Sequence, residues 1–225
     1  MIKKNRKMKN VILKVCLLSL PICAVFLQAC ATINITRKDL ESFESITVVR
    51  YKTPDLQIKT LTGVILLGAG GGAIVPTVAA SQVDKKSTKN ATQGVIFPDY
   101  GELLMSQFIK IAQEEIRDWP KTIPISNPVE RRYQHKGGAL IVIDVNHMWI
   151  TLVGGLTIEG DVIMRNTTGH DIFKRHFFYR SRDFGIKKGQ KEYIANNAKL
   201  LIEEIPVAAE HTARDLIIKY LKESL

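Results

Sequence analysis

Residues 156–182 contain two alternating runs joined by a short polar turn, and this pattern restricts the fold more than any other feature of the sequence. In residues 156–165 hydrophobic side chains alternate with polar ones, and in residues 171–182 aromatic side chains alternate with basic ones. Such alternation is typical of half-buried β-strands. The polar residues 166–170, which include Gly169, predict a hairpin turn between them. The chain should therefore contain antiparallel strands with one buried face.

Two further stretches predict strands. Residues 46–51 are rich in β-branched side chains and are closed by Thr53-Pro54-Asp55, with a possible extension over residues 56–61. Residues 139–149 begin with a continuous apolar run, as in a strand that is buried on both faces. Residues 120–138 contain three prolines and a glycine pair, so we expect a loop there.

A first helix is predicted to begin at Asp99. Asp99 can cap the free amides, and Glu102 three residues later completes a capping box. Trp119-Pro120 should end the helix, because the residue before a proline is pushed out of helical geometry. Between these limits one apolar stripe runs along the helix, formed by Leu104, Phe108, Ile111, Ala112 and Ile116.

A long second helix is predicted from about Glu192 to the end of the chain. Apolar residues keep helical spacing from Ile194 to Tyr220. Pro206 lies inside this helix and predicts a kink over residues 202–205. The element order is then β-α-β-β-β-α. It predicts an α/β (α+β) two-layer sandwich, with a mostly antiparallel or mixed sheet and two helices on one face.

The N-terminus has the three parts of an export signal. The first nine residues carry five basic side chains and no acid, and an apolar core follows over residues 15–27. That core is shorter than the roughly 20 residues of a membrane-spanning helix. It ends in Leu27-Gln28-Ala29-Cys30, which resembles the lipobox of bacterial lipoproteins. This resemblance implies that residues 1–29 are a signal peptide and that Cys30 carries the lipid.

The cysteines agree with this interpretation. Cys16 and Cys23 would leave with the signal, so Cys30 would be the single cysteine of an exported chain and acylation would cap its thiol. The alternative is an ordinary signal peptide cleaved near Ala29 or Ala31, with no lipid on Cys30. Because Ala31 rather than Asp follows the cysteine, the resemblance implies the periplasmic face of the outer membrane more than the inner membrane.

Removing the signal changes the charge. Residues 1–29 contain six of the 32 basic residues and none of the 22 acidic ones, so the net charge falls from +10 to about +4. The basic excess therefore does not indicate nucleic-acid binding. The remaining 196 residues are enough for one domain with its own core, which we expect over residues 46–225 after a short tether at residues 30–45.

The predicted domain loosely resembles small envelope lipoproteins, namely the auxiliary lipoproteins of ABC-type lipid transporters and the periplasmic domains of curli-secretion-like proteins. The resemblance lies in the element order and in three unspecific features. They are Val48-Val49-Arg50 followed by Pro54, the Trp119-Pro120 helix end, and Phe178-Tyr179-Arg180-Ser181. It implies a role in envelope transport or assembly and no particular functional residue.

Residues 63–80 form an uncharged, glycine-rich apolar segment. Gly68 and Gly72 form a GxxxG pair that would let helices approach closely, and Ile65, Leu66 and Leu67 precede it. One interpretation is contact with the membrane or with other subunits. Another is an apolar loop or hairpin packed on its own domain. A degenerate dinucleotide fingerprint is the weakest alternative, because no βαβ unit follows. We therefore expect no nucleotide.

No catalytic or metal-binding pattern is evident in the sequence. There is no HExxH or GxSxG motif, and the carboxylates Glu159 and Asp161 are expected to be solvated on a strand face. We expect no cofactor, no metal and no enzymatic activity. The five histidines, likewise expected to be solvated rather than metal-binding, are His135, His147, His170, His176 and His211.

Basic side chains occur in small clusters between aromatic ones. They could face anionic headgroups or an acidic partner, or simply form a solvated surface. The clusters are Arg131-Arg132, Lys174-Arg175, Arg180 with Arg182, and Lys187-Lys188.

The sequence thus predicts a membrane-anchored, non-enzymatic envelope lipoprotein that binds protein partners or lipid, or associates with itself. The alternative is an oligomeric secretion or pore component that inserts residues 63–80 into the membrane. A hydrolase of envelope polymers is a third possibility, and it would need a cleft with converging carboxylates or histidines.

Overall fold

The computed structural model describes residues 35–59, 92–131, 133, 135, 138–151 and 155–225. The predicted signal peptide, Cys30 and the glycine-rich segment 63–80 lie outside these residues. Everything below concerns the compact unit that spans residues 34–225.

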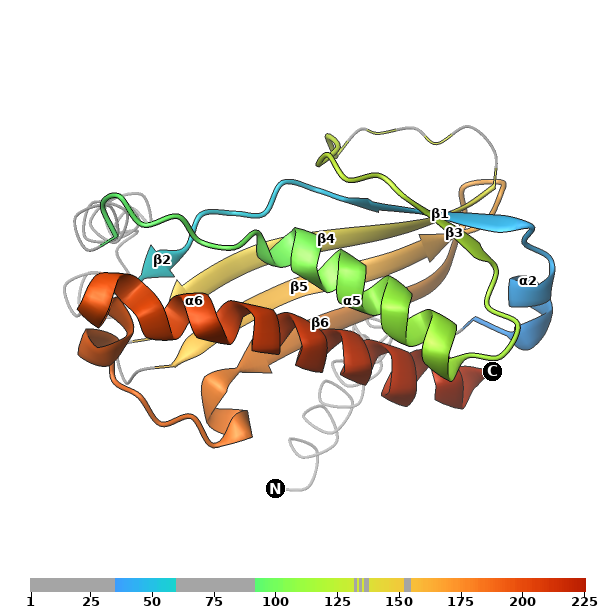
Figure 1. Cartoon of the computed structure of the whole chain (residues 1–225). Helices are drawn as coiled ribbons and strands as arrows, with labels where there is room; N and C mark the ends of the chain where they lie inside the picture. The colour runs from blue at the N-terminus through green and yellow to red at the C-terminus, as the bar shows by residue number, and fades with distance from the viewer. Residues whose placement is uncertain (1–34, 60–91, 132, 134, 136–137, 152–154) are drawn as a thin grey trace, which may run out of the picture. The chain divides into compact units, whose positions relative to one another are not determined.

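A six-stranded mixed sheet forms the centre of this unit (Figure 1). Five strands lie in the order β3-β1-β4-β5-β6, and β2 also pairs with β4. The pairs formed by β1 and β2 are parallel, whereas β4, β5 and β6 are antiparallel neighbours. The strands are β1 (Ser45–Arg50), β2 (Gln57–Ile58), β3 (Lys121–Pro124), β4 (Ala139–Ile150), β5 (Leu156–Arg165) and β6 (Asp171–Arg180).

Two helices, α5 and α6, cover one face of this sheet, as the sequence predicts (Figure 1). Their buried side chains and those of the strands form one hydrophobic core, in which the apolar stripe of α5 is fully buried. The helical elements are α2 (Arg37–Glu41), α5 (Tyr100–Glu115), η1 (Ser181–Phe184), α6 (Gln190–Asp215), the π-helical turn η2 (Leu216–Leu221) and η3 (Lys222–Ser224).

The hairpin β5–β6 confirms the strongest prediction from the sequence. In β6 Phe173, Phe177 and Tyr179 are buried under the helices, whereas Lys174 and Arg180 are exposed on the opposite face. At the turn the Asn166 side chain accepts hydrogen bonds from backbone amides, and Gly169 takes a φ of +83° that suits glycine.

The expectation of a loop over residues 120–138 is wrong for Lys121–Pro124, which form the edge strand β3. Ser45 to Val48 of β1 pair with these residues in parallel register. The strand has only four residues, and Pro120 and Pro124 make the segment look like a loop in the sequence. Its formation depends on pairing with a strand that lies far away in sequence, which local patterns do not reveal.

The packed unit begins earlier than residue 46, within the segment expected to be a tether. The short helix α2 is closed at its start by a capping box between Thr36 and Asp39. Ile35 and Leu40 are buried in the core. Two apolar residues are too few to show a helical period, which explains why the sequence did not predict this helix.

Both long helices differ from the prediction in detail. Helix α5 ends at Glu115 rather than next to Trp119, and Asp118 has a positive φ of 61°. In α6 the non-helical backbone angles fall at residues 195–198 rather than at the predicted 202–205. Asn196 and Asn197 adopt left-handed angles, which asparagine tolerates better than most residues.

Candidate functional site

A cavity lies where the chain leaves the edge of β4. Arg50 at the end of β1 pairs with Ile143, and Gln57 in β2 pairs with Trp149 further along the same strand. Between these two pairings the chain detours through Pro54. Proline has no amide to donate to a strand, so this detour is built into the sequence. The detour leaves room beside Met148 of β4.

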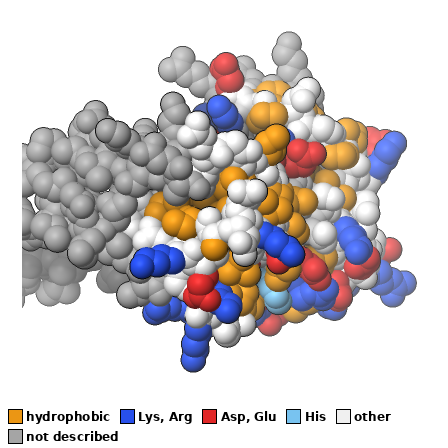
Figure 2. All heavy atoms as spheres, turned by 60° about the vertical axis from the view of Figure 1, so that its left-hand side comes forward, with side chains coloured by type: hydrophobic (Ala, Val, Ile, Leu, Met, Phe, Trp, Pro, Cys, Tyr) orange, Lys and Arg blue, Asp and Glu red, His pale blue; other side chains and the backbone are white. Residues whose placement is uncertain are grey.

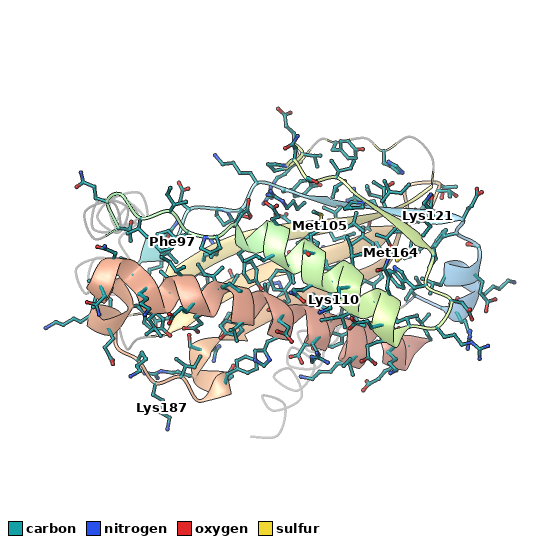
Figure 3. The ribbon with its side chains drawn as sticks, in the orientation of Figure 1. Phe97, Met105, Lys110, Lys121, Met164 and Lys187 are labelled. Atoms are coloured by element: carbon teal, nitrogen blue, oxygen red, sulfur yellow. The ribbon has the colours of Figure 1, made fainter. Side chains whose placement is uncertain are left out.

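This cavity has a volume of about 760 Å³ and a mostly apolar lining. Its size lies within the range of roughly 300–1,000 Å³ that is typical of small-molecule sites. Figure 3 shows Phe97 in the loop before α5, and Gln57 of β2 and Ile205 of α6 line the same cavity. The apolar lining consists of Pro54, Leu56, Val95, Phe97, Pro98, Met148 and Ile205.

The surface at this end of the molecule also carries apolar side chains. Figure 2 turns this end forward and shows hydrophobic side chains in the middle of the view, with charged ones gathered toward its lower and right-hand parts. Ile96, next to the lining residue Val95, is 91% exposed. The loop of residues 92–99 therefore presents apolar side chains both to the cavity and to its surroundings.

One wall of the cavity is held by a buried arginine. The Arg50 guanidinium, only 4% exposed, lies 2.8 Å from a carboxylate oxygen of Asp99 and 3.3 Å from one of Glu102. Asp99 also accepts hydrogen bonds from the Thr53 hydroxyl at 2.6 Å and from the Glu102 amide, which caps α5. The predicted cap at Asp99 is thus confirmed, but the predicted capping box is not formed, because the Glu102 carboxylate pairs with Arg50 instead. The Asp99 carboxylate thus links the loop after β1 to the start of α5, and both segments border the cavity.

The charge around the cavity is negative. Among the described residues that line it, the charged ones are Asp55 and Asp99. Asp99 is neutralised by Arg50, whereas Asp55 is exposed and forms no ion pair with a described residue. The remaining polar lining comes from Thr53, Gln57 and Thr92. A neutral or positively charged polar group fits such a mouth better than an anion does.

The wall formed by α6 is fixed by a buried polar network. Glu204, next to the lining residue Ile205, is 4% exposed and accepts hydrogen bonds from the hydroxyls of Tyr179 and Tyr193. Burial raises the pKa of both tyrosines, and the neighbouring Glu204 carboxylate raises it further. Both hydroxyls therefore remain protonated donors, and α6 keeps one position against β6.

Two of the predicted histidines and the strand carboxylates lie on the sheet face opposite the helices. His176 contacts Asp161 at 3.2 Å, and His147 contacts Glu159 at 3.6 Å. Asp144 lies opposite Asp161 across the strands, and burial raises its pKa. No group of three or more His, Cys, Asp or Glu side chains in the described part of the chain is arranged to hold a metal ion.

His211 lies on α6, where its ring is 4.2 Å from that of Phe184, and it lines a groove together with His176. His135 stacks on Tyr133 at 6.4 Å, and His170 lies at the hairpin turn. The structure thus does not bring the five histidines together.

The structure also places the predicted basic clusters on different parts of the fold. Arg131 is engaged with Asp144 at 2.9 Å and lies over the Tyr51 ring. Lys188 pairs with Glu192, and Lys187 points away from the domain in Figure 3. Lys174 and Arg180 instead share the exposed face of β6. Among these clusters, the basic residues on β6 are the ones gathered on one element.

The sequence did not single out the residues that line the cavity. Its best signal was Pro54, which predicts that the first strand ends there. The apolar run Val95-Ile96-Phe97-Pro98 before the Asp99 cap was a second signal. Of the predicted contact residues, Ile65, Leu66, Leu67, Gly68 and Gly72 lie outside the described residues, as does the lipidation residue Cys30.

No family model matches the chain, and no curated protein matches it. One similar solved structure is that of an uncharacterized protein, with 13% identity and a TM-score of 0.36, which covers 82% of this chain and 95% of the other. A second is a Xanthomonas campestris protein of family DUF330, with 9% identity and a TM-score of 0.34, covering 82% and 92%.

Within the described residues, no helix is both long and apolar enough to cross a membrane.

Proposed function

We propose that this protein is a non-enzymatic, lipid-anchored envelope lipoprotein whose domain binds an apolar ligand of lipid character in the cavity beside β4. The observation that carries the binding function is the cavity itself, with its volume of about 760 Å³ and apolar lining. The lipobox-like residues 27–30 support the anchor. An anchored domain with an apolar cavity suits a role in lipid transport or envelope assembly.

The lining also restricts the ligand. An acyl chain can contact Leu56, Phe97 and Met148, while Thr53 and Gln57 offer hydrogen bonds to a polar head. Asp55 disfavours an anionic head by repulsion. The ligand we propose is therefore a lipid with a neutral or zwitterionic head.

Photocrosslinking tests this proposal on the purified, lipidated full-length chain. A photoactivatable phosphatidylethanolamine is added, and the crosslinked peptides are identified by mass spectrometry. We expect crosslinks in residues 53–57 and 92–99, which border the cavity. Phosphatidylglycerol carrying the same photoactivatable chain should crosslink several-fold less, because its head is anionic.

Two neighbouring substitutions provide the matched comparison. Val95→Arg places a charged side chain in the cavity and should abolish the crosslinks, because burying an unpaired charge among apolar groups is costly. Ile96→Arg changes a residue that does not line the cavity and should leave them intact. Equal crosslinking of both variants, or crosslinks spread over the whole surface, would rule out the cavity as the binding site.

The anchor is tested separately. Cells are fed an alkyne-tagged fatty acid, and the chain is examined for the label and for its presence in the membrane fraction. Cys30→Ala should lose the label and the membrane association, because the Cys30 sulfur is the atom that receives the lipid. A labelled Cys30→Ala variant, or an unlabelled wild type, would contradict the lipoprotein assignment without affecting the cavity.

A further inference from the structure

Strand β6 is an edge of the sheet, and it differs from the opposite edge. Among the described strands, β6 pairs only with β5. The other edge, β3, has four residues and ends in Pro124, so it is short and partly closed to pairing. In contrast, β6 has ten residues and contains neither proline nor glycine. Its outer edge therefore offers a longer row of backbone groups for a further strand.

A groove follows this edge. Residues 176–179 of β6 form one wall, and α6 with η2 forms the other through His211, Leu216 and Tyr220. Its volume is about 160 Å³, which holds one or two side chains. Phe184 stacks on Tyr179 at 5.0 Å and lines the same groove. The groove thus has aromatic rings on both walls, with Thr212 and Asp215 as polar lining, and it lies alongside strand backbone.

The exposed face of β6 is basic. Lys174 and Arg180 are exposed there, and neither forms an ion pair with another described residue. The Arg180 guanidinium lies 4.4 Å above the ring of Phe178, which is itself 41% exposed. The carboxylates of the neighbouring strand, Glu159 and Asp161, lie beside His147 and His176. Lys174 and Arg180 therefore remain available to an external partner.

We propose that an extended segment of a partner protein, with alternating acidic and apolar residues, adds to the outer edge of β6 as a further strand. Alternate side chains of a strand point to opposite faces. The apolar side chains of the segment would enter the aromatic groove, and its acidic side chains would face Lys174 and Arg180. Backbone hydrogen bonds supply the affinity in such strand addition, and the two side-chain faces supply the specificity.

A second copy of this chain is a poorer occupant. The exposed face of β6 carries Lys174 and Arg180 and no acidic side chain, so pairing two β6 strands would place two basic faces side by side. Like charges on paired strands repel one another, and natural proteins use such basic edges to prevent self-pairing. The partner should therefore carry the opposite charge. This site does not involve the cavity beside β4, so the two proposals can fail independently.

Peptide binding to the purified full-length chain tests the proposal. The probe is a fluorescent, end-capped peptide of about eight residues that alternates glutamate and valine, which matches the length of an ordinary strand. A second peptide has lysine in place of glutamate. We expect the acidic peptide to bind, and the basic one not to bind, in a polarisation assay. Equal binding of the two would overturn the proposal.

Charge reversal on the chain gives a matched pair of variants. Lys174→Glu combined with Arg180→Glu should weaken the acidic peptide about tenfold or more, because attraction on one face becomes repulsion. Lys110→Glu combined with Lys187→Glu, two exposed positions outside β6, changes the net charge equally and should leave binding within about twofold. Lys110 lies on a helix rather than on the edge strand (Figure 3). Equal loss in both would mean a general charge effect and would overturn the site.

Backbone methylation distinguishes strand addition from loose electrostatic attraction. Two versions of the acidic peptide carry N-methyl groups on alternate residues, one on the odd set and one on the even set. Only one set of amides faces β6 in a strand, so one version should lose binding and the other should keep it. Equal binding of both versions would overturn strand addition.

Anionic phospholipid vesicles are the probe for the alternative occupant. If the vesicles bind in place of the peptide, and the double variant loses this binding too, the surface would be assigned to lipid instead.

Discussion

The Tyr179 hydroxyl donates a 3.0 Å hydrogen bond to the Glu204 carboxylate, and this buried contact joins the edge strand β6 to helix α6. Tyr193 donates to the other carboxylate oxygen at 2.6 Å. Tyr193 also lies 3.1 Å from the Ser181 hydroxyl, which hydrogen-bonds the backbone of Leu156 in β5. The network therefore connects two strands with the helix that borders both proposed binding sites.

Substitution of Glu204 should destabilise the domain. In Glu204→Ala two buried tyrosine hydroxyls lose their acceptor, and we expect the free energy of unfolding to fall by about 3 kcal/mol. Glu204→Gln keeps one carbonyl acceptor and should cost less. Urea unfolding followed by circular dichroism measures both. A Glu204→Ala variant as stable as the wild type would show that the network is not stabilising.

The buried tyrosines should make the fold sensitive to alkaline pH. Burial raises the pKa of Tyr100, Tyr179 and Tyr193 above the ordinary value of about 10. A raised folded-state pKa contributes stability that is fully present below about pH 10 and is lost as the pH rises through the folded-state value. Above about pH 10, stability should fall by about 1.4 kcal/mol per pH unit for each tyrosine.

Unfolding measured at a series of alkaline pH values tests this dependence, and Tyr193→Phe serves as its comparison. The variant has one ionisable phenol fewer, so its stability should fall less steeply with pH. A slope that is the same in the variant and the wild type would contradict the assignment of this dependence to Tyr193.

Gly160→Ala should disrupt the β5–β6 hairpin. A Cβ atom at this position would collide with the carbonyl oxygen of Asp144 and would lie 2.5 Å from the Cζ atom of the Phe177 ring. The backbone oxygen cannot move aside easily, so we expect a loss of about 3 kcal/mol. Gly169→Ala is the comparison, because no heavy atom lies within 4 Å and only its positive φ is strained, costing about 1 kcal/mol. Thermal unfolding should rank the two in this order.

Asp99 should contribute both a helix cap and a partner for Arg50. Asp99→Ser retains a capping oxygen but removes the carboxylate 2.8 Å from the buried guanidinium, for an expected cost of about 2 kcal/mol. Asp99→Ala also removes the cap and should cost about 1 kcal/mol more. Equal stability of the two variants in urea unfolding would mean that the cap contributes nothing.

Local sequence patterns predicted only part of this structure, and the residues that line the cavity show why. Phe97 and Met148 line one cavity but lie in a loop and in a strand that are 51 positions apart. A pattern of period two or 3.6 describes which residues share a face of one element. It does not say which loops of different elements meet. Pro54 indicated where the strand would stop, and the cavity appears only when β4 continues past that point.

The sequence by itself determined the elements whose burial follows a period. These are the hairpin β5–β6, the apolar stripe of α5 with its Asp99 cap, and the final helix, and together they required a sheet with two helices on one face. Only the tertiary structure decided the parallel pairing of β3 with β1, the buried contact between Tyr179 and Glu204, and the position of β6 at an edge of the sheet. Each of these depends on groups far apart in sequence. Their pairing is selected by the packing of the whole domain rather than by local propensity.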